Sequence, residues 1–183
     1  MTSQEAALQE AVTILEKLSL PHMLIGGLAV IAWDVPRATL DVDLHLWVEA
    51  DQLEKTASEL LTMLRAATAD PLEFLRQSRV LPVLSSGNVR VDLVFARLPI
   101  ELEMIRRARR KTIAGAAVPV ASLEDLIWMK LLSERQQDLE DARRLLRRHR
   151  QNLDREYLEP RLRELAEALS RSEILEIYDG EVT

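Results

Sequence analysis

Residues 24–47 read LIGGLAVIAWDVPRATLDVDLHLW. This stretch predicts a strand, a double-glycine turn, a short helix and a second strand. Side chains alternate between the two faces of a strand, so the residues of the second strand that face the core would be Leu40, Val42, Leu44 and Leu46. Asp41 and Asp43 would lie together on the other face, about 7 Å apart along the strand. Because two like charges repel, this pair needs water or a cation between its members, and Mg²⁺ is commonly bound by one or two carboxylates.

The two glycines supply a second feature of a phosphate site. Gly26 and Gly27 follow the apolar strand 23–25 and precede the helix expected over 28–34. Glycine lets the backbone turn sharply and lets a ligand approach the peptide N–H groups, and the start of a helix attracts phosphate. Each feature alone has a plainer interpretation, as an ordinary turn and as the solvent-facing side of a sheet. Together they are typical of a site that binds a nucleoside triphosphate.

The combination of Ile-Gly-Gly at 25–27 with Asp-Val-Asp-Leu at 41–44 resembles the nucleotidyltransferase superfamily of DNA polymerase beta. The longer segment RATLDVDL, residues 37–44, resembles the AbiEii/MenT-like branch, which includes toxins of toxin–antitoxin systems. The resemblance implies an α+β fold: a nucleotidyltransferase-type mixed β-sheet flanked by helices, with a helical C-terminal extension. It also implies that Arg37 and Thr39 bind the nucleotide with the two glycines. From the residues alone, Arg37 is as well explained by a structural ion pair.

A third carboxylate is expected on a later strand. The apolar runs 80–84 and 89–96 flank a turn and predict a hairpin, in which Asp92 points away from the core beside Arg90. An ordinary solvent-facing aspartate is the plainer interpretation. The resemblance implies instead that Asp92 completes a catalytic set with the Asp-x-Asp pair, able to hold two Mg²⁺ ions. The fallback candidates for this third position are Glu101 and Glu103.

A charged motif, KLLSERQQDLED, occupies residues 130–141. On one continuous helix a single stripe would contain Lys130, Glu134, Asp138 and Asp141. A solvent-exposed face with i,i+4 ion pairs explains this equally well. The resemblance implies that Lys130 contacts phosphate or assists the nucleophile, that Asp138 is catalytic, and that Arg135 and Asp141 bind the nucleotide. Gln137 replaces the lysine usual in the family at that position.

The rest of the chain predicts helices and one more hairpin. The expected helices are residues 3–19, 51–67 with Asp51 as N-cap, 71–79, 99–110, a helix capped by Ser122, and a further helical tail that includes 154–170; the hairpin is 112–120. We expect a nucleotidyltransferase core over residues 1–121 and a helical extension over 122–183, packed as one unit.

Composition favours a globular protein of the cytoplasm. Hydrophobic residues make up 48% of the 183, no run is long enough to cross a membrane, and there is no cysteine. The formal charge of −6 argues against broad nucleic-acid binding, although the basic runs 106–111 and 143–150 leave an RNA-binding groove as an alternative to solvated helix faces.

The resemblance therefore implies a metal-dependent enzyme that moves a nucleoside monophosphate from an NTP to a hydroxyl of RNA, tRNA or protein. Its implied cofactor is Mg²⁺, and its implied partner is an antitoxin protein. The alternatives are a nucleotidyltransferase that modifies a small molecule such as an antibiotic, and a non-catalytic nucleotide-binding regulatory module.

Overall fold

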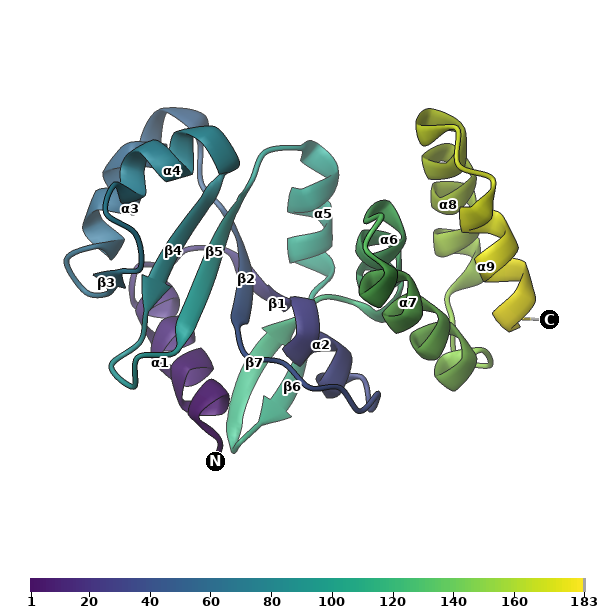
Figure 1. The fold of residues 1–183 in the computed structure, drawn as a ribbon, viewed down its shortest axis with the longest axis horizontal. Helices are drawn as coiled ribbons and strands as arrows, with labels where there is room; N and C mark the ends of the chain where they lie inside the picture. Colours follow the sequence, from purple (N-terminus) through teal and green to yellow (C-terminus); the bar gives the residue numbers. More distant parts are fainter. Residues whose placement is uncertain (183) are drawn as a thin grey trace. The chain divides into compact units, whose positions relative to one another are not determined.

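The computed structural model describes residues 1–182 (Figure 1). Its helices are α1 (Ser3–Lys17), α2 (Gly26–Ala32), α3 (Leu53–Leu60), α4 (Pro71–Ser78), α5 (Pro99–Arg107), α6 (Leu123–Leu132), α7 (Gln136–His149), α8 (Arg155–Leu169) and α9 (Glu173–Val182), with a short 3₁₀ turn η1 (Ala50–Gln52). Its strands are β1 (His22–Ile25), β2 (Val42–Trp47), β3 (Arg65–Ala66), β4 (Val80–Leu84), β5 (Arg90–Ala96), β6 (Arg109–Ile113) and β7 (Ala116–Val120).

The strands of the described residues form one mixed sheet in the order β3-β4-β5-β2-β1-β7-β6 (Figure 1). The pairs β2–β5 and β1–β7 are parallel, and all other neighbours are antiparallel. In the central strands, Leu24, Leu44 and Leu93 are fully buried. The mixed sheet with flanking helices confirms the predicted α+β class.

The chain divides into two compact units. The sheet unit contains Met1–Ala32 and Arg37–Ala121, and the helical unit contains Trp33–Pro36 and the residues from Ser122 onward. The connector Trp33–Pro36 therefore belongs with helices that follow it by about ninety positions in the sequence. The expected division at 121/122, with both parts packed as one, stays a prediction.

Several helices and strands form where short stretches of the sequence predict them. Thr2 and Glu5 form a capping box at the start of α1, and Ser122 accepts a hydrogen bond from the Asp125 backbone N–H at the start of α6. The two hairpins, β4–β5 and β6–β7, also form as expected. In each of these places a few neighbouring residues determine the structure.

The predicted strand with Leu40 facing the core was wrong at its start. The strand begins at Val42, Leu40 is 80% exposed, and Asp41 precedes the strand. The reason is pairing: Val42 is the first residue of β2 with a partner on β5, and the pairing with β1 begins only at Asp43. Leu40 and Asp41 therefore have no partner on a neighbouring strand.

The predicted turn and helix around the glycines also differ from the structure. The helix begins at Gly26 rather than at Leu28. Gly26 alone, with a φ of +65°, makes the turn between β1 and the helix. It ends at Ala32 rather than at Asp34, since Asp34 adopts a left-handed conformation with φ of +59°.

Two of the predicted helices are shorter in the structure, because part of each predicted range pairs as a β-strand instead. The helix expected from an N-cap at Asp51 through residue 67 is only α3, because Asp51 lies in η1 and the chain then pairs β3 with β4. The helix expected over 99–110 ends at Arg107, since Arg109 opens β6 by pairing with Val120. Hydrogen bonds from distant strands override local helical spacing here.

The predicted continuous helix over 130–141 was wrong as well. Helix α6 ends at Leu132, and α7 begins at Gln136. Ser133 Oγ accepts from the Arg135 backbone N–H and donates to the Asp138 carboxylate, so local hydrogen bonds replace those of the helix.

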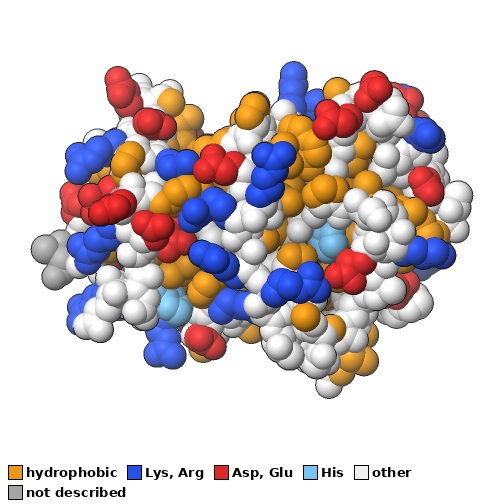
Figure 2. Space-filling view, turned by 180° about the vertical axis from the view of Figure 1, so that it is seen from behind, with side chains coloured by type: hydrophobic (Ala, Val, Ile, Leu, Met, Phe, Trp, Pro, Cys, Tyr) orange, Lys and Arg blue, Asp and Glu red, His pale blue; other side chains and the backbone are white. Residues whose placement is uncertain are grey.

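The molecular surface mixes charge and hydrophobicity. Figure 2 shows Lys and Arg side chains at several places on one face, with hydrophobic side chains exposed between them. Across residues 1–182, no helix combines the length and hydrophobicity needed to cross a bilayer.

Candidate active site

Two of the predicted carboxylates lie directly opposite each other in the centre of the sheet. Asp43 on β2 pairs in register with Asp92 on β5, and the strands are parallel. Registered residues of adjacent strands point to the same face, about 4.8 Å apart between backbones. Both residues are partly buried. The sheet therefore presents two carboxylates side by side on one face.

The Asp43 carboxylate also lies against the start of α2. A Cβ placed on Gly26 would overlap this carboxylate, and the positive φ of Gly26 disfavours any side chain there. A Cβ on Gly27 would lie 2.6 Å from Thr39 Oγ1 and 3.2 Å from Arg37 Cζ. The double glycine thus lets Asp43, Thr39 and Arg37 approach one short piece of backbone.

We predict that Gly26→Ala lowers the free energy of unfolding by about 2 to 5 kcal/mol, combining left-handed strain with overlap against Asp43. Gly115→Ala is the matched control, because Gly115 also has a positive φ (+87°) but a Cβ there meets nothing within 4 Å. The control should lose only about 1 to 2 kcal/mol in the same urea titration. Equal losses of unfolding free energy in the two variants would mean that overlap with Asp43 contributes nothing at Gly26.

Arg90 supplies positive charge beside the carboxylates. Its Nε donates to Asp92 Oδ1 at 2.9 Å, and this hydrogen bond, with the negative charges of Asp92, Asp41 and Asp43, raises the pKa of Arg90. The carboxylates therefore already attract one cation, the Arg90 guanidinium, and carboxylate oxygens are also ligands that Mg²⁺ prefers. Within residues 1–182, no three His, Asp or Glu side chains form a ready-made metal-binding group.

His45, two residues after Asp43, connects this face of β2 to α5. Its Nε2 lies 3.2 Å from Glu101 Oε1, and the His45 side chain is 5% exposed. Glu101 also accepts hydrogen bonds from the backbone N–H groups of Arg97 and Leu98. Burial works to raise the pKa of Glu101, but His45 and these N–H groups lower it to about 2. The fallback candidate Glu101 is thus already engaged in fixing the helix.

The lowered pKa of Glu101 predicts a pH-dependent loss of stability. A carboxylate with a lowered pKa stabilises the fold above its unfolded pKa of 4.5, and the stabilisation disappears as the pH falls toward 2. Glu101→Gln should therefore cost about 2 to 3 kcal/mol at pH 7 and less than half of that at pH 3, measured by urea unfolding. A cost independent of pH would contradict the assignment.

A second charged cluster lies in the helical unit. Lys130 Nζ, on α6, lies 2.5 Å from Asp138 Oδ1 and 3.1 Å from Asp141 Oδ2, both on α7. Ser133 donates to Asp138 Oδ2 at 2.8 Å, and Arg135 Nε lies 3.8 Å from the same oxygen. Burial alone would raise the pKa of Asp138, but the hydrogen bonds from Lys130 and Ser133 hold it below its ordinary value.

The break between the helices is what allows this geometry. Lys130 reaches both aspartates across the turn 133–135, while Glu134, predicted on the same stripe, is exposed. Ser133 was absent from the sequence-based candidates. A serine inside the charged motif, whose hydroxyl can compete with helical hydrogen bonds, was the available signal.

The arrangement of strand, double glycine, helix and paired aspartates on neighbouring strands defines a nucleotidyltransferase. The chain matches the family described as "Nucleotidyl transferase of unknown function (DUF2204)" over residues 4–176, and it belongs to that family. The predicted superfamily and enzyme class are confirmed; the AbiEii/MenT-like branch stays a prediction. No curated protein matches the chain.

Solved structures share the fold. ANT(2'')-Ia in complex with adenylyl-2''-tobramycin has a TM-score of 0.61 at 19% identity, covering 92% of this chain and 99% of that one. An antigenic nucleotidyltransferase-like protein from Paracoccidioides brasiliensis has a TM-score of 0.57 at 17% identity, covering 98% and 94%. The lincosamide antibiotic adenylyltransferase LnuA, lincomycin-bound, has a TM-score of 0.51 at 14% identity, covering 79% and 96%. These likenesses confirm the nucleotidyltransferase-type fold.

Proposed function

We propose that this nucleotidyltransferase moves a nucleoside monophosphate from an NTP to an acceptor hydroxyl in a Mg²⁺-dependent reaction. The acceptor hydroxyl oxygen forms a bond to the α-phosphorus and loses its proton to Asp138 or to solvent. The bond from that phosphorus to the bridging oxygen of the β-phosphate breaks, and pyrophosphate leaves with the electron pair. The observation that carries the proposal is the position of the Asp43 carboxylate, opposite Asp92 and against Gly26.

In this proposal Asp41, Asp43 and Asp92 hold the metal, and the attraction of Arg90 to the same carboxylates supports a cation at this place. Bound Mg²⁺ would polarise the phosphoryl group and neutralise charge that develops on the triphosphate. The backbone of Gly26 and Gly27 would contact the triphosphate, with Arg37 and Thr39 beside it. In phosphoryl transfer, most of the rate acceleration comes from positioning the reacting groups and from electrostatic stabilisation of the transition state.

We further assign Lys130 and Asp138 to charge stabilisation and proton transfer, and Arg135 and Asp141 to nucleotide binding. The support is the buried hydrogen-bonded cluster, because ionised side chains are rarely buried without a structural or chemical role. The structural role predicts a separate loss of stability when Lys130 is removed.

Two acceptor classes remain in the proposal. The first is RNA, tRNA or protein in the cytoplasm, with the protein acting as a toxin that an antitoxin restrains; it is supported by the likeness of residues 37–44 to the AbiEii/MenT-like branch. The second is a small molecule of the antibiotic type. It is supported by the likeness in fold, over 92% of this chain, to ANT(2'')-Ia, whose structure contains adenylyl-2''-tobramycin.

One assay separates these classes from each other and from a non-catalytic module. The protein is incubated with Mg²⁺ and each α-labelled NTP, together with total RNA, cell protein or a set of aminoglycosides and lincosamides. We expect label in one acceptor class and equimolar pyrophosphate. Nucleotide binding without label in any acceptor would favour the non-catalytic module, and transfer that survives EDTA would exclude the metal.

A further inference from the structure

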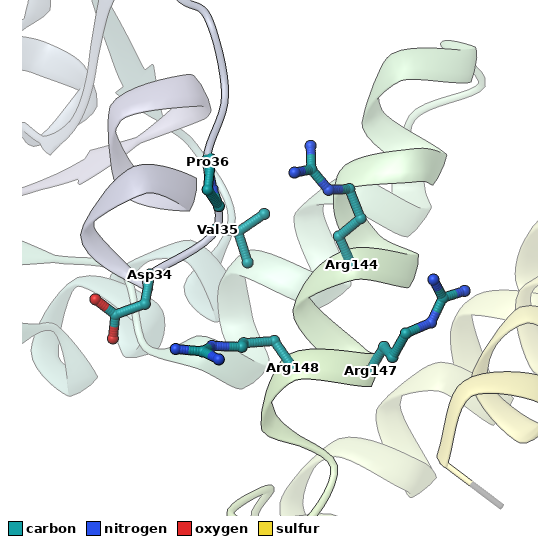
Figure 3. Close-up of a pocket in the computed structure, with 6 residues that line it drawn as sticks. All are labelled: Asp34, Val35, Pro36, Arg144, Arg147 and Arg148. Atoms are coloured by element: carbon teal, nitrogen blue, oxygen red, sulfur yellow. The ribbon is translucent and has the colours of Figure 1, made fainter.

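A pocket of about 490 Å³ lies within the helical unit (Figure 3). Its lining residues are Asp34, Val35, Pro36, Arg144, Arg147 and Arg148. One wall is the connector between α2 and β2, and the other is the C-terminal half of α7 (Figure 3). A pocket of this size accommodates a small organic ligand or one nucleotide of a strand.

The connector wall is fixed to the helix. The carbonyl oxygen of Trp33 accepts a hydrogen bond from His149 Nε2 at 2.7 Å, and the two rings meet edge to face at 5.8 Å. Val35 is 3% exposed, so the connector is anchored by an apolar side chain as well. These contacts form the pocket before any ligand arrives, which reduces the entropy lost on binding.

The arginines that line the pocket differ in their partners. Arg147 is paired with Glu181 through two hydrogen bonds of 2.8 and 2.9 Å. Arg144 and Arg148 have no ion pair or hydrogen bond with any side chain of residues 1–182. Figure 3 shows the guanidinium of Arg148 directed toward Asp34, which is the pocket's one acidic lining residue. Two guanidinium groups therefore remain available to a ligand.

We propose that this pocket binds the phosphate group of an organic phosphate. Arg144 and Arg148 are four residues apart on α7, which places their Cβ atoms about 6 Å apart on one helix face. Guanidinium groups bind phosphate oxygens through paired hydrogen bonds, and a phosphate offers enough oxygens for two of them. A single carboxylate satisfies one arginine, as Glu181 does for Arg147.

The apolar part of the pocket favours an organic phosphate over the inorganic ion. Pro36 offers an exposed hydrophobic surface beside the guanidinium groups, and contact with a sugar or base would remove this surface from water. The same chemistry occurs in the phosphodiesters of an RNA strand and in a free nucleotide. Neither source requires that the pocket take part in the transfer reaction, so the inference stands apart from the proposed function.

The test compares two double variants of the full chain. Arg144→Gln/Arg148→Gln removes the available guanidinium groups, and Arg150→Gln/Arg163→Gln removes the same charge from exposed positions of the helical unit outside the pocket. A labelled 12-nucleotide single-stranded RNA is titrated by fluorescence anisotropy, and AMP by calorimetry. We expect the pocket variant to bind at least tenfold more weakly than the control. For RNA, the slope of log K against log salt should also fall by about 1.4.

The outcomes assign the source of the phosphate. A loss for RNA alone identifies a strand, a loss for AMP alone identifies a free nucleotide, and a loss for both supports a site that accepts either. Equal binding by both variants, or no binding of either probe to the unmodified protein, overturns the proposal. Arg144→Lys/Arg148→Lys, which keeps the charge but not the paired donors, should bind with intermediate affinity. Equal melting temperatures of all variants exclude misfolding as the cause.

Discussion

Replacing Asp43 by asparagine is expected to slow nucleotide transfer at least a hundredfold while leaving the fold intact. The amide has the shape of the carboxylate, so it still fits against Gly26 and opposite Asp92. It has no negative charge, and it therefore cannot neutralise a metal ion or help to hold it. Losing a metal ligand removes several kcal/mol of transition-state stabilisation, and each 1.4 kcal/mol or so is a factor of ten in rate.

Asp41→Asn should lose activity to a similar extent, and Asp51→Asn provides the control. Asp51 is exposed in η1 and has the same change of charge, so its variant should keep the rate of the unmodified protein. The measurement is initial pyrophosphate release at saturating NTP with the acceptor found in the transfer assay. Retained activity in both the Asp41 and Asp43 variants would refute the proposed metal site.

The sequence predicted the central strands of the sheet because their pattern is local. Alternation along residues 89–96 placed Asp92 away from the core, and in the structure Asp92 is partly exposed between the buried Val91 and Leu93. The register that brings Asp92 opposite Asp43 is not local: it depends on how two strands separated by two helices and two further strands align. The resemblance, rather than periodicity, was what linked these two aspartates.

Other features depended on contacts that no sequence window contains. Leu40 continues the apolar alternation of β2, but it lacks a paired strand and is exposed. The connector 33–36 has no pattern that assigns it to the helical unit, because its anchor, His149, is more than one hundred residues away. Spacing on one helix predicted that Lys130 would share a stripe with Asp138 and Asp141. The three are close in the structure because a turn at Ser133 folds one helix against the next.

Removal of Lys130 should have a large effect on stability. Lys130→Met leaves a side chain of similar length but no charge, so Asp138 and Asp141 lose their shared cation in a buried place. Breaking a buried ion pair by removing one partner typically costs about 3 to 5 kcal/mol, and we expect a loss of that size at pH 7. Urea unfolding followed by circular dichroism measures it.

The pH dependence of this loss has a defined sign. The pKa of Asp138 is lowered in the folded protein, so its stabilisation is present above the unfolded pKa of 3.8 and is lost as the pH falls through the folded value. In Lys130→Met the main cause of that lowered pKa is gone. The difference in stability between the variant and the unmodified protein should therefore shrink as the pH is lowered from 7 toward 3.

A triple variant distinguishes the structural role of the cluster from its proposed catalytic role. Lys130→Met/Asp138→Asn/Asp141→Asn has no unpaired buried charge and should recover most of the stability lost in the single variant. If the cluster only supports the fold, the triple variant transfers nucleotide at nearly the normal rate. We expect instead a folded protein with little activity, because Lys130 and Asp138 then no longer supply charge or a proton to the reaction. A triple variant as unstable as Lys130→Met alone would mean that unpaired charge is not the cause of the instability.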